Sequence, residues 1–336
     1  MKQFGAGIKI IGSGSAAPLT ALDNEELSQM VETSDEWIRS RTGIAQRCLA
    51  TPEESLSSIA AKAANQALNM AGIEAKKLDL IILATSSPDD LFGSACEIQT
   101  QIGATKAVAF DLTAACSGFI FALITASQFI RTGVYQNILV IGADILSRWV
   151  DWSDRSTCIL FGDGAGAVVI QGNTEADDLL GFEMRSDGSQ NYTLKLGYQG
   201  TPQTLNERVS VAQGGYQPIT MNGREVYRFA VEKVPEVISK ALFKANLEAA
   251  QVDWLLLHQA NQRILNAVAK RLKIKPEKVI SNLANYGNTS AASIPLALDE
   301  AVREGKIKSG DVIAASGFGA GLTWGAAIFK WGGVFK

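Results

Sequence analysis

The chain has 336 residues, 47% of them hydrophobic and 19% charged, a composition typical of a globular protein that buries its own core. The formal net charge of −3 gives no reason to expect a nucleic-acid partner. No apolar run approaches the roughly 20 residues of a membrane helix, and Gly5, Gly7 and Lys9 interrupt any signal-peptide core. The four scattered cysteines indicate free thiols, so we expect a cytoplasmic protein.

Short apolar runs alternate with amphipathic stretches along the chain. The runs predict strands at 8–11, 80–85, 107–110, 137–143 and 167–170, and again at 254–257, 278–281, 311–315 and 326–329. Segments such as 56–70 and 291–304 have apolar residues at helical spacing. This alternation predicts a layered α/β fold.

Three pairs of segments repeat in the same order. AGIEAKKLDLIILA, from Ala71, resembles ANLEAAQVDWLLLH, from Ala245. CSGFIFALITASQFIRTG, from Cys116, resembles NTSAASIPLALDEAVREG, from Asn288, and FGDGAGAVVI at 161–170 resembles FGAGLTWGAAIF at 318–329. We infer two copies of one strand–helix unit, residues 1–172 and 173–336. Cys116 is then equivalent to Asn288, and His258 is equivalent to Ala84 at the carboxyl end of a strand, where α/β proteins bind ligands.

Three residues that the repeat places together are candidates for chemistry. Cys116 either packs as a small hydrophobe or, at a helix N-terminus, has a lowered pKa and acts as a nucleophile. His258, the one histidine of the chain, is either structural or an acid, base or hydrogen-bond donor. Asn288, in NYGNTSAASIP, is either a turn or helix-capping residue or, through its equivalence to Cys116, part of the same site.

The glycine motifs and the basic helix faces also have alternative interpretations. GSGSAA at 12–17 matches a dinucleotide fingerprint, but Pro18 follows and no helix opens, so we do not expect nucleotide binding. GFGAG at 317–321 is either a tight turn or a source of backbone N–H groups for an oxyanion hole. The spacing of Arg263 and Lys270 predicts one helix face, which is either solvated or holds an acidic partner.

The chain resembles the thiolase-like condensing enzymes, and within them the β-ketoacyl-acyl carrier protein synthase III family. The segments that carry the resemblance are TSDEWIRSRTGI, DLTAACSGF, DRSTCILFGDGAGA, LLLHQANQRI, NYGNTSAASIPLALDEA and GFGAGLTWG. It implies a thiolase-like fold of two duplicated halves with a layered α-β-α-β-α core, and a homodimer. It also implies a catalytic site of Cys116, His258 and Asn288, with the N–H groups of Cys116 and Ala320 as the oxyanion hole.

The resemblance further implies roles for residues around the site. Those expected to bind coenzyme A are Trp37, Arg41, Arg155 and Asn261. Those expected to dock acyl carrier protein are Arg228, Arg263 and Lys270, and those expected to line the acyl pocket are Leu91, Phe92, Leu160 and Tyr227. The chain has Phe318-Gly319-Ala320-Gly321 where the family often has F-G-G-G, and Leu91-Phe92-Gly93 where it often has F-P-S. The second difference leaves the length of the primer open.

The expected reaction is a decarboxylative condensation of a short acyl-coenzyme A, such as acetyl-coenzyme A, with malonyl-acyl carrier protein. Cys116 becomes acylated, and His258 and Asn288 then donate hydrogen bonds to the malonyl thioester as carbon dioxide leaves. We expect no metal and no cofactor beyond the coenzyme A thioester substrate. The alternatives are a synthase III-like acyltransferase of secondary metabolism, a Cys–His–Asn hydrolase, which lacks the C-G-x-C-W signature, and a nucleotide-binding protein.

Overall fold

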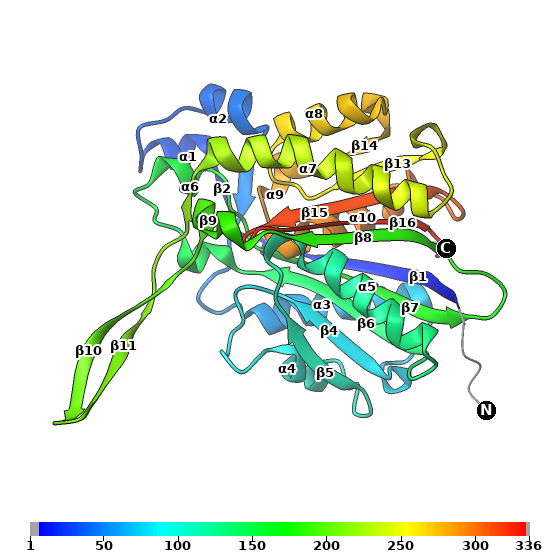
Figure 1. Cartoon of the computed structure of the whole chain (residues 1–336), viewed down its shortest axis with the longest axis horizontal. Helices are drawn as coiled ribbons and strands as arrows, with labels where there is room; N and C mark the ends of the chain where they lie inside the picture. The colour runs from blue at the N-terminus through cyan, green and yellow to red at the C-terminus, as the bar shows by residue number, and fades with distance from the viewer. Residues whose placement is uncertain (1–6, 334–336) are drawn as a thin grey trace.

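The computed structural model describes residues 7–333 and contains two five-stranded sheets with equivalent strand orders (Figure 1). In sheet order, the first consists of β1 (Gly7–Ala16), β7 (Gly164–Asn173), β6 (Asn137–Asp144), β4 (Leu80–Ala84) and β5 (Val108–Leu112). In the same order, the second consists of β8 (Leu179–Ser186), β16 (Thr323–Lys330), β15 (Val312–Gly319), β13 (Trp254–Leu257) and β14 (Val279–Ile280). In each sheet the second strand, β7 or β16, pairs antiparallel with both of its neighbours and the remaining pairs are parallel, so the two halves share one topology.

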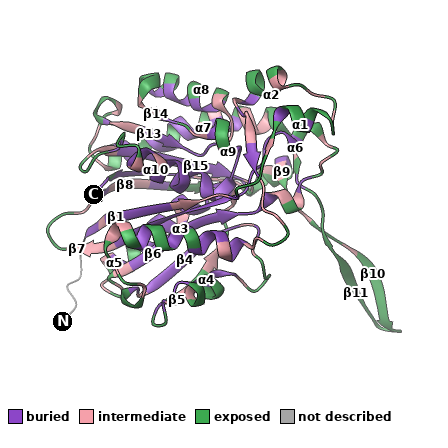
Figure 2. Cartoon of the chain, turned by 180° about the vertical axis from the view of Figure 1, so that it is seen from behind, coloured by how far each residue is buried: buried purple, intermediate pink, exposed green. Residues whose placement is uncertain are grey.

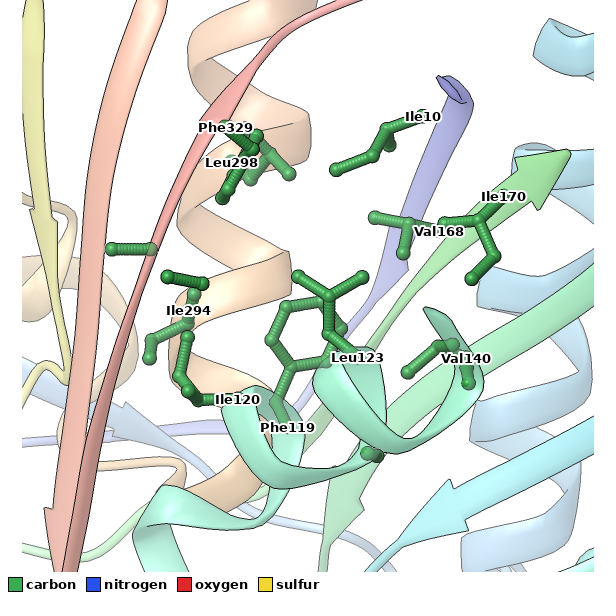
Figure 3. Packing of buried hydrophobic residues seen from close by; sticks show 14 of the residues in the cluster. Ile10, Phe119, Ile120, Leu123, Val140, Val168, Ile170, Ile294, Leu298 and Phe329 are labelled. Atoms are coloured by element: carbon green, nitrogen blue, oxygen red, sulfur yellow. The ribbon is translucent and has the colours of Figure 1, made fainter. Parts of the chain in front are cut away.

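Helices form three layers around these sheets. α5 (Gly118–Arg131) and α10 (Ser293–Arg303) lie between the sheets, where Phe119, Leu123 and Leu298 belong to a buried cluster that includes residues of both (Figure 3). α3 (Leu56–Ala71) and α4 (Ala95–Gln101) cover the outer face of the first sheet, and α7 (Gly223–Lys244) and α8 (Gln262–Leu272) cover that of the second. The order of layers is therefore α-β-α-β-α, as predicted.

The local sequence explains why these elements form where they do. β4 is buried along its whole length because helices cover both faces of its sheet, which explains its uninterrupted apolar run. α3 begins after Ser55, whose side chain accepts the N–H of Ser58 in a capping box. The same helix ends at Gly72, which adopts the left-handed conformation that glycine tolerates best (φ 66°).

Smaller elements form a cap over one end of the two sheets, with an apolar cluster of its own. They are β2 (Ala21–Asp23), α1 (Asn24–Ser28), α2 (Asp35–Thr42), β3 (Gln46–Cys48), α6 (Arg155–Cys158), β9 (Leu194–Lys195), β12 (Thr220–Met221) and α9 (Leu283–Tyr286). Short 3₁₀ turns lie at Ala75–Lys77, Ala115–Ser117, Leu146–Trp149, Gly188–Thr193, Ala249–Gln251, Pro276–Lys278 and Ser290–Ala292.

A long β-hairpin extends from the body of the molecule. Its strands, β10 (Tyr198–Asn206) and β11 (Val209–Tyr216), are exposed almost throughout (Figure 2). The sequence did not predict this hairpin, nor the edge strand β8, because neither contains a sufficiently apolar run. No helix in the described part of the chain is both long and apolar enough to cross a lipid bilayer.

The structure corrects one equivalence between the halves. The strands align as predicted, because Leu80 pairs with Ile138 in the first sheet as Trp254 pairs with Ile313 in the second. The turns do not. Ala115–Ser117 precedes α5 and Ser290–Ala292 precedes α10, so the residue equivalent to Cys116 is the middle residue of the second turn rather than Asn288.

Candidate active site

Cys116 lies at the centre of the 3₁₀ turn that precedes α5. The residue before it, Ala115, has a φ of 47°, a strained conformation for a residue with a side chain. The turn packs against two glycines of β15 from the other half. A Cβ atom on Gly317 would lie 3.1 Å from the Cys116 carbonyl oxygen, and one on Gly319 would lie 2.6 Å from the Cys116 nitrogen. Glycine at these positions therefore allows the close approach and leaves space in front of the Cys116 N–H.

The equivalent turn of the second half packs on the first half in the same way. A Cβ atom on Gly142 of β6 would lie 2.2 Å from the carbonyl oxygen of Ala291, the residue that corresponds to Cys116. Asp144 takes the place that Gly319 has in the other half, and its carboxylate accepts the Ala291 N–H at 3.1 Å. Each turn thus rests on a strand of the opposite half. In one copy a carboxylate oxygen faces the turn N–H, and in the other a glycine leaves that place open.

Cys116 is buried, with 7% of its surface exposed. Its sulfur accepts a hydrogen bond from the Ser290 hydroxyl, with Oγ 3.3 Å from Sγ. The expected lowering of its pKa is not found. Burial raises the pKa of the Cys116 thiol to about 12, the Ser290 hydrogen bond opposes the rise, and the nearby Asp144 charge adds to it. The expectation from the sequence considered the helix terminus but could not include the desolvation of the sulfur.

His258 follows β13 and is buried beside the ring of Phe318, with ring centroids 5.4 Å apart in an edge-to-face arrangement. Its Nδ1 lies 2.7 Å from the Ser293 hydroxyl, which also accepts the backbone N–H of Gln259 at 3.3 Å. Since that hydroxyl already accepts one hydrogen bond, it can donate its own proton to Nδ1 and leave Nε2–H as a donor. Burial lowers the pKa of His258 to about 3, so the imidazole is neutral at physiological pH.

Asn288 is held by its backbone and its side chain. Its N–H donates to the Leu160 carbonyl at 2.8 Å, and its carbonyl accepts the Gly162 N–H at 3.0 Å. The side-chain Oδ1 accepts the N–H of Ser290 at 3.0 Å. Because Oδ1 is occupied in this way, the amide presents its NH₂ group as a donor.

Two cavities meet at the Cys116 sulfur. The smaller has a volume of about 460 Å³ and is lined by Cys116, His258 and Asn288, so the three residues predicted from the sequence lie in one site. The larger, of about 1170 Å³, is lined by Cys116 and Ala320, the two residues predicted to form the oxyanion hole, among others. Cys116 can therefore meet one substrate group from each side.

Similar proteins identify the family of the chain. Family models described as 3-oxoacyl-[acyl-carrier-protein] synthase III and its C-terminal part match residues 110–188 and 242–331. The chain is 72% identical to a β-ketoacyl-[acyl-carrier-protein] synthase III of Trichormus variabilis over 97% of this chain and 98% of that one. It belongs to the β-ketoacyl-[acyl-carrier-protein] synthase III family.

Solved structures show the same fold over nearly all of this synthase III family member. The 3-oxoacyl-[acyl-carrier-protein] synthase III of Aquifex aeolicus is 46% identical, with a TM-score of 0.89, and the match covers 97% of this chain and 100% of that one. The priming β-ketosynthase of the R1128 polyketide biosynthetic pathway is 31% identical, with a TM-score of 0.90, over 99% and 98%. The thiolase-like fold predicted from the sequence is confirmed.

In this family member, the four residues predicted to bind coenzyme A lie together. The Arg155 guanidinium lies 4.9 Å and that of Arg41 5.8 Å from the centre of the Trp37 ring. Asn261 caps α8 and donates from Nδ2 to the Arg41 carbonyl at 3.0 Å. Arg41 and Asn261 line the smaller cavity, so the group lies at an entrance to the site.

The four residues predicted to line the acyl pocket divide between the two cavities, and their role stays a prediction. Leu91 and Phe92 line the larger cavity and are 75% and 100% exposed. Leu160 and Tyr227 line the smaller cavity, on the side of His258. A sequence match gives no information on which face of the nucleophile a residue lies.

The three residues predicted to dock acyl carrier protein are exposed on two neighbouring helices. Arg228 lies on α7, and Arg263 and Lys270 lie on α8. The Arg263 guanidinium lies 5.6 Å from the centre of the Tyr227 ring, and Arg263 also lines the smaller cavity. Of the three charges, that of Arg263 therefore lies at this entrance. Among residues 7–333 there is no cluster of ligating side chains suited to a metal ion.

The sequence did not single out Ser290 and Ser293, which contact Cys116 and His258, or Asp144, whose charge acts on the Cys116 thiol. Both serines belong to the NTSAAS segment that had suggested Asn288. Asp144 directly follows the strand predicted at 137–143, a position where α/β proteins often carry functional residues. That position was the one available signal for Asp144.

Proposed function

We propose that this chain catalyses the decarboxylative condensation of a short acyl-coenzyme A, such as acetyl-coenzyme A, with malonyl-acyl carrier protein. The products would be 3-oxoacyl-acyl carrier protein, coenzyme A and carbon dioxide, the first condensation of fatty-acid synthesis. The observation that supports this best is the position of Cys116 between two cavities, one of which contains His258 and Asn288. A nucleophile with one substrate group on each side suits a reaction that joins two acyl units.

In the first step, the Cys116 sulfur attacks the thioester carbonyl and coenzyme A leaves with the proton of the thiol. The N–H groups of Cys116 and Ala320 would hold the negative oxygen of the tetrahedral intermediate. The open space beside Gly319 supports this assignment. In the other half, the oxygen of Asp144 bonds the equivalent N–H, so this geometry is suited to a negatively charged oxygen.

In the second step, the malonyl group loses carbon dioxide and its carbanion attacks the acylated Cys116. The thioester oxygen gains charge as carbon dioxide leaves, and it would accept hydrogen bonds from Nε2–H of His258 and the NH₂ group of Asn288. The lowered pKa of His258 supports a donor role, since an imidazole that resists protonation is a poor base at neutral pH. These side chains meet the needs of the reaction, so we propose that it requires no metal or redox cofactor.

The substrates would be held outside the reacting centre by the surrounding charged and aromatic groups. The Trp37 ring and the Arg155 guanidinium suit the flat adenine of coenzyme A and its phosphates. Arg228, Arg263 and Lys270 suit an acidic carrier protein through long-range charge attraction. The acyl group of the primer would enter the larger cavity beside Leu91 and Phe92.

We also propose a homodimer, formed through the edge of the first sheet. β5 is the edge strand there, and its residues Val108 and Phe110 are exposed. Leu91 and Phe92 add apolar surface near the mouth of the larger cavity. An exposed apolar edge strand can pair with a second chain.

We further propose a cytoplasmic location, where the four free thiols would stay reduced.

The division of the chain into residues 1–172 and 173–336 remains part of the proposal. It assigns the nucleophile to the first half and the two hydrogen-bond donors to the second. Residue 172 lies near the end of β7, the last strand of the first sheet.

The second candidate is an acyltransferase of secondary metabolism with the same acylation step. It is favoured by the likeness to the priming ketosynthase of a polyketide pathway. Release of carbon dioxide from malonyl-acyl carrier protein, paired with formation of the 3-oxoacyl product, would separate the two. An enzyme that is acylated normally but transfers its acyl group to another nucleophile would support the second candidate.

The test of the main proposal measures the two half-reactions separately. Radiolabelled acetyl-coenzyme A reports acylation, and carbon dioxide release from malonyl-acyl carrier protein reports decarboxylation. We expect Cys116→Ala to lose acylation altogether, while His258→Ala and Asn288→Ala lose decarboxylation roughly 100- to 1,000-fold and retain more of the acylation rate. Cys48→Ala, which removes a buried thiol elsewhere, is the control. A His258→Ala enzyme that cannot be acylated but still releases carbon dioxide would contradict these roles.

A further inference from the structure

We propose that Ser290 is a catalytic residue of the acylation step, whose hydroxyl donates a hydrogen bond to the Cys116 sulfur as the thiolate forms. The inference rests on the proposed function, because it concerns the same nucleophile. It starts from a single contact, the 3.3 Å approach of Ser290 Oγ to Cys116 Sγ inside the core of the protein. Three further observations show that this contact is built into the site.

The backbone holds Ser290 in an unusual conformation. Its φ is 51°, in the left-handed region where serine is uncommon and glycine would be relaxed. The Asn288 Oδ1 accepts a hydrogen bond from the Ser290 N–H, with 3.0 Å between oxygen and nitrogen, and Ser290 is 2% exposed. A strained, buried residue whose hydroxyl faces the nucleophile indicates that the hydroxyl has a function at this position.

The hydroxyl has one proton and two possible acceptors. One is the Cys116 sulfur, and the other is the carboxylate of Asp144, whose pKa the nearby Ser290 side chain lowers. Asp144 has four other donors, at 2.8 to 3.2 Å: Thr85 Oγ1, Ser86 N, Ser87 Oγ and Ala291 N. Its carboxylate therefore does not depend on Ser290, and the serine proton can turn to the sulfur when charge develops there.

The sulfur needs such a donor because its surroundings disfavour a negative charge. Burial and the Asp144 carboxylate both oppose ionisation of Cys116, and the Ser290 hydrogen bond favours it. In the attack, the bond from Sγ to the acyl carbon forms, the bond from that carbon to the coenzyme A sulfur breaks, and coenzyme A carries away the thiol proton. Ser290 transfers no proton. Once the sulfur is a thioester, it is a weaker acceptor, and the hydroxyl can return to Asp144.

The experiment measures the rate of Cys116 alkylation by iodoacetamide as a function of pH, with peptide mass mapping to identify the labelled residue. A hydrogen bond to a charged group shifts a pKa by roughly one to two units. For Ser290→Ala we therefore expect the alkylation profile to move to higher pH by that amount, with a rate roughly 10- to 100-fold lower at neutral pH. Ser127→Ala, which removes a buried hydroxyl on α5 away from the site, should leave the profile unchanged.

A second readout separates this role from a structural one. Ser290→Ala keeps the backbone N–H that orients Asn288, so carbon dioxide release should be equal in Cys116→Ala and in Cys116→Ala with Ser290→Ala. If Ser290→Ala does not fold, Ser290→Gly removes the same hydroxyl and relieves the left-handed strain. An alkylation profile identical to that of the wild type, or an equal loss of decarboxylation, would overturn the proposal. Failure of the wild type to accept an acyl group would instead overturn the proposed function, and the alkylation result would still stand.

Discussion

Because the His258 imidazole is buried, the free energy of unfolding should decrease at acid pH. Substitution of this one residue separates its contribution from that of the other titrating groups. Burial lowers its pKa from 6.5 to about 3, so the folded chain resists a proton that the unfolded chain accepts. Since the folded pKa is the lower one, the stabilisation is complete above pH 6.5 and is lost as the pH falls toward about 3. Each pH unit is worth about 1.4 kcal/mol, so the loss at pH 5 is about 2 kcal/mol.

The substitution that tests this is His258→Asn. It removes the titration and can place an amide oxygen near the position of Nδ1, where it can accept from the Ser293 hydroxyl. Urea unfolding at pH 7 and pH 5 gives the free energy of unfolding of both proteins. We expect the decrease between the two pH values to be about 2 kcal/mol smaller in the variant, because the acidic groups shared by both proteins cancel in the comparison.

The one histidine of the chain also allows a direct measurement. Its imidazole signals in an NMR spectrum need no assignment, and we expect them to show no titration between pH 8 and pH 5. An imidazole that titrates near its ordinary pKa would show that burial does not lower the pKa of His258. So would a free energy of unfolding that has the same pH dependence in the wild type and in His258→Asn.

Three further changes test the rest of the site. Gly319→Ala would place a methyl group 2.6 Å from the Cys116 nitrogen, so we expect single-turnover acylation to fall roughly 100- to 1,000-fold in a folded protein; normal acylation would place the oxyanion elsewhere. Arg263→Glu should weaken the reaction with malonyl-acyl carrier protein more than acylation by acyl-coenzyme A, most strongly at low salt, with Lys62→Glu on the opposite outer helix as control. Equal, salt-independent losses in both reactions would argue against docking by Arg263. Trp37→Ala should raise the KM for acyl-coenzyme A roughly 5- to 100-fold, because a base stacked on an aromatic ring contributes about 1–3 kcal/mol, and an unchanged KM would remove Trp37 from the binding site.

The strands show how much of the fold the sequence repeat could predict. Ala84 and His258 were aligned correctly because the apolar runs before them have the same length and the same register against their neighbouring strands. The turns were misaligned for a physical reason. α5 has 14 residues and α10 has 11, so matching the glycines that follow them, Gly133 and Gly305, displaced the other ends of the helices.

The site residues were predicted from the family motifs, but their electrostatic environment was not. The thiol pKa was expected to fall because a helix follows Cys116, which is a local feature of the chain. It rises because the sulfur is desolvated by residues distant in sequence. Ser290 contacts the nucleophile only because the two halves pack face to face, and no spacing within either segment reports that contact. Asp144 comes from the same half as Cys116 and acts on the thiol through its charge.

The turn of each half packs on a strand of the opposite half, and this arrangement also affects when the site can form during synthesis of the chain. The turn at Cys116 rests on Gly317 and Gly319, which are synthesised about 200 residues after it. Until β15 packs against this turn, the proposed oxyanion space is not enclosed. Until the second half folds, the sulfur also lacks the Ser290 hydroxyl beside it. A nascent chain can form its first sheet early, but Cys116 then still lacks its contacts with the second half. If Cys116 is the nucleophile, as proposed, the chain cannot be acylated there before β15 has been synthesised.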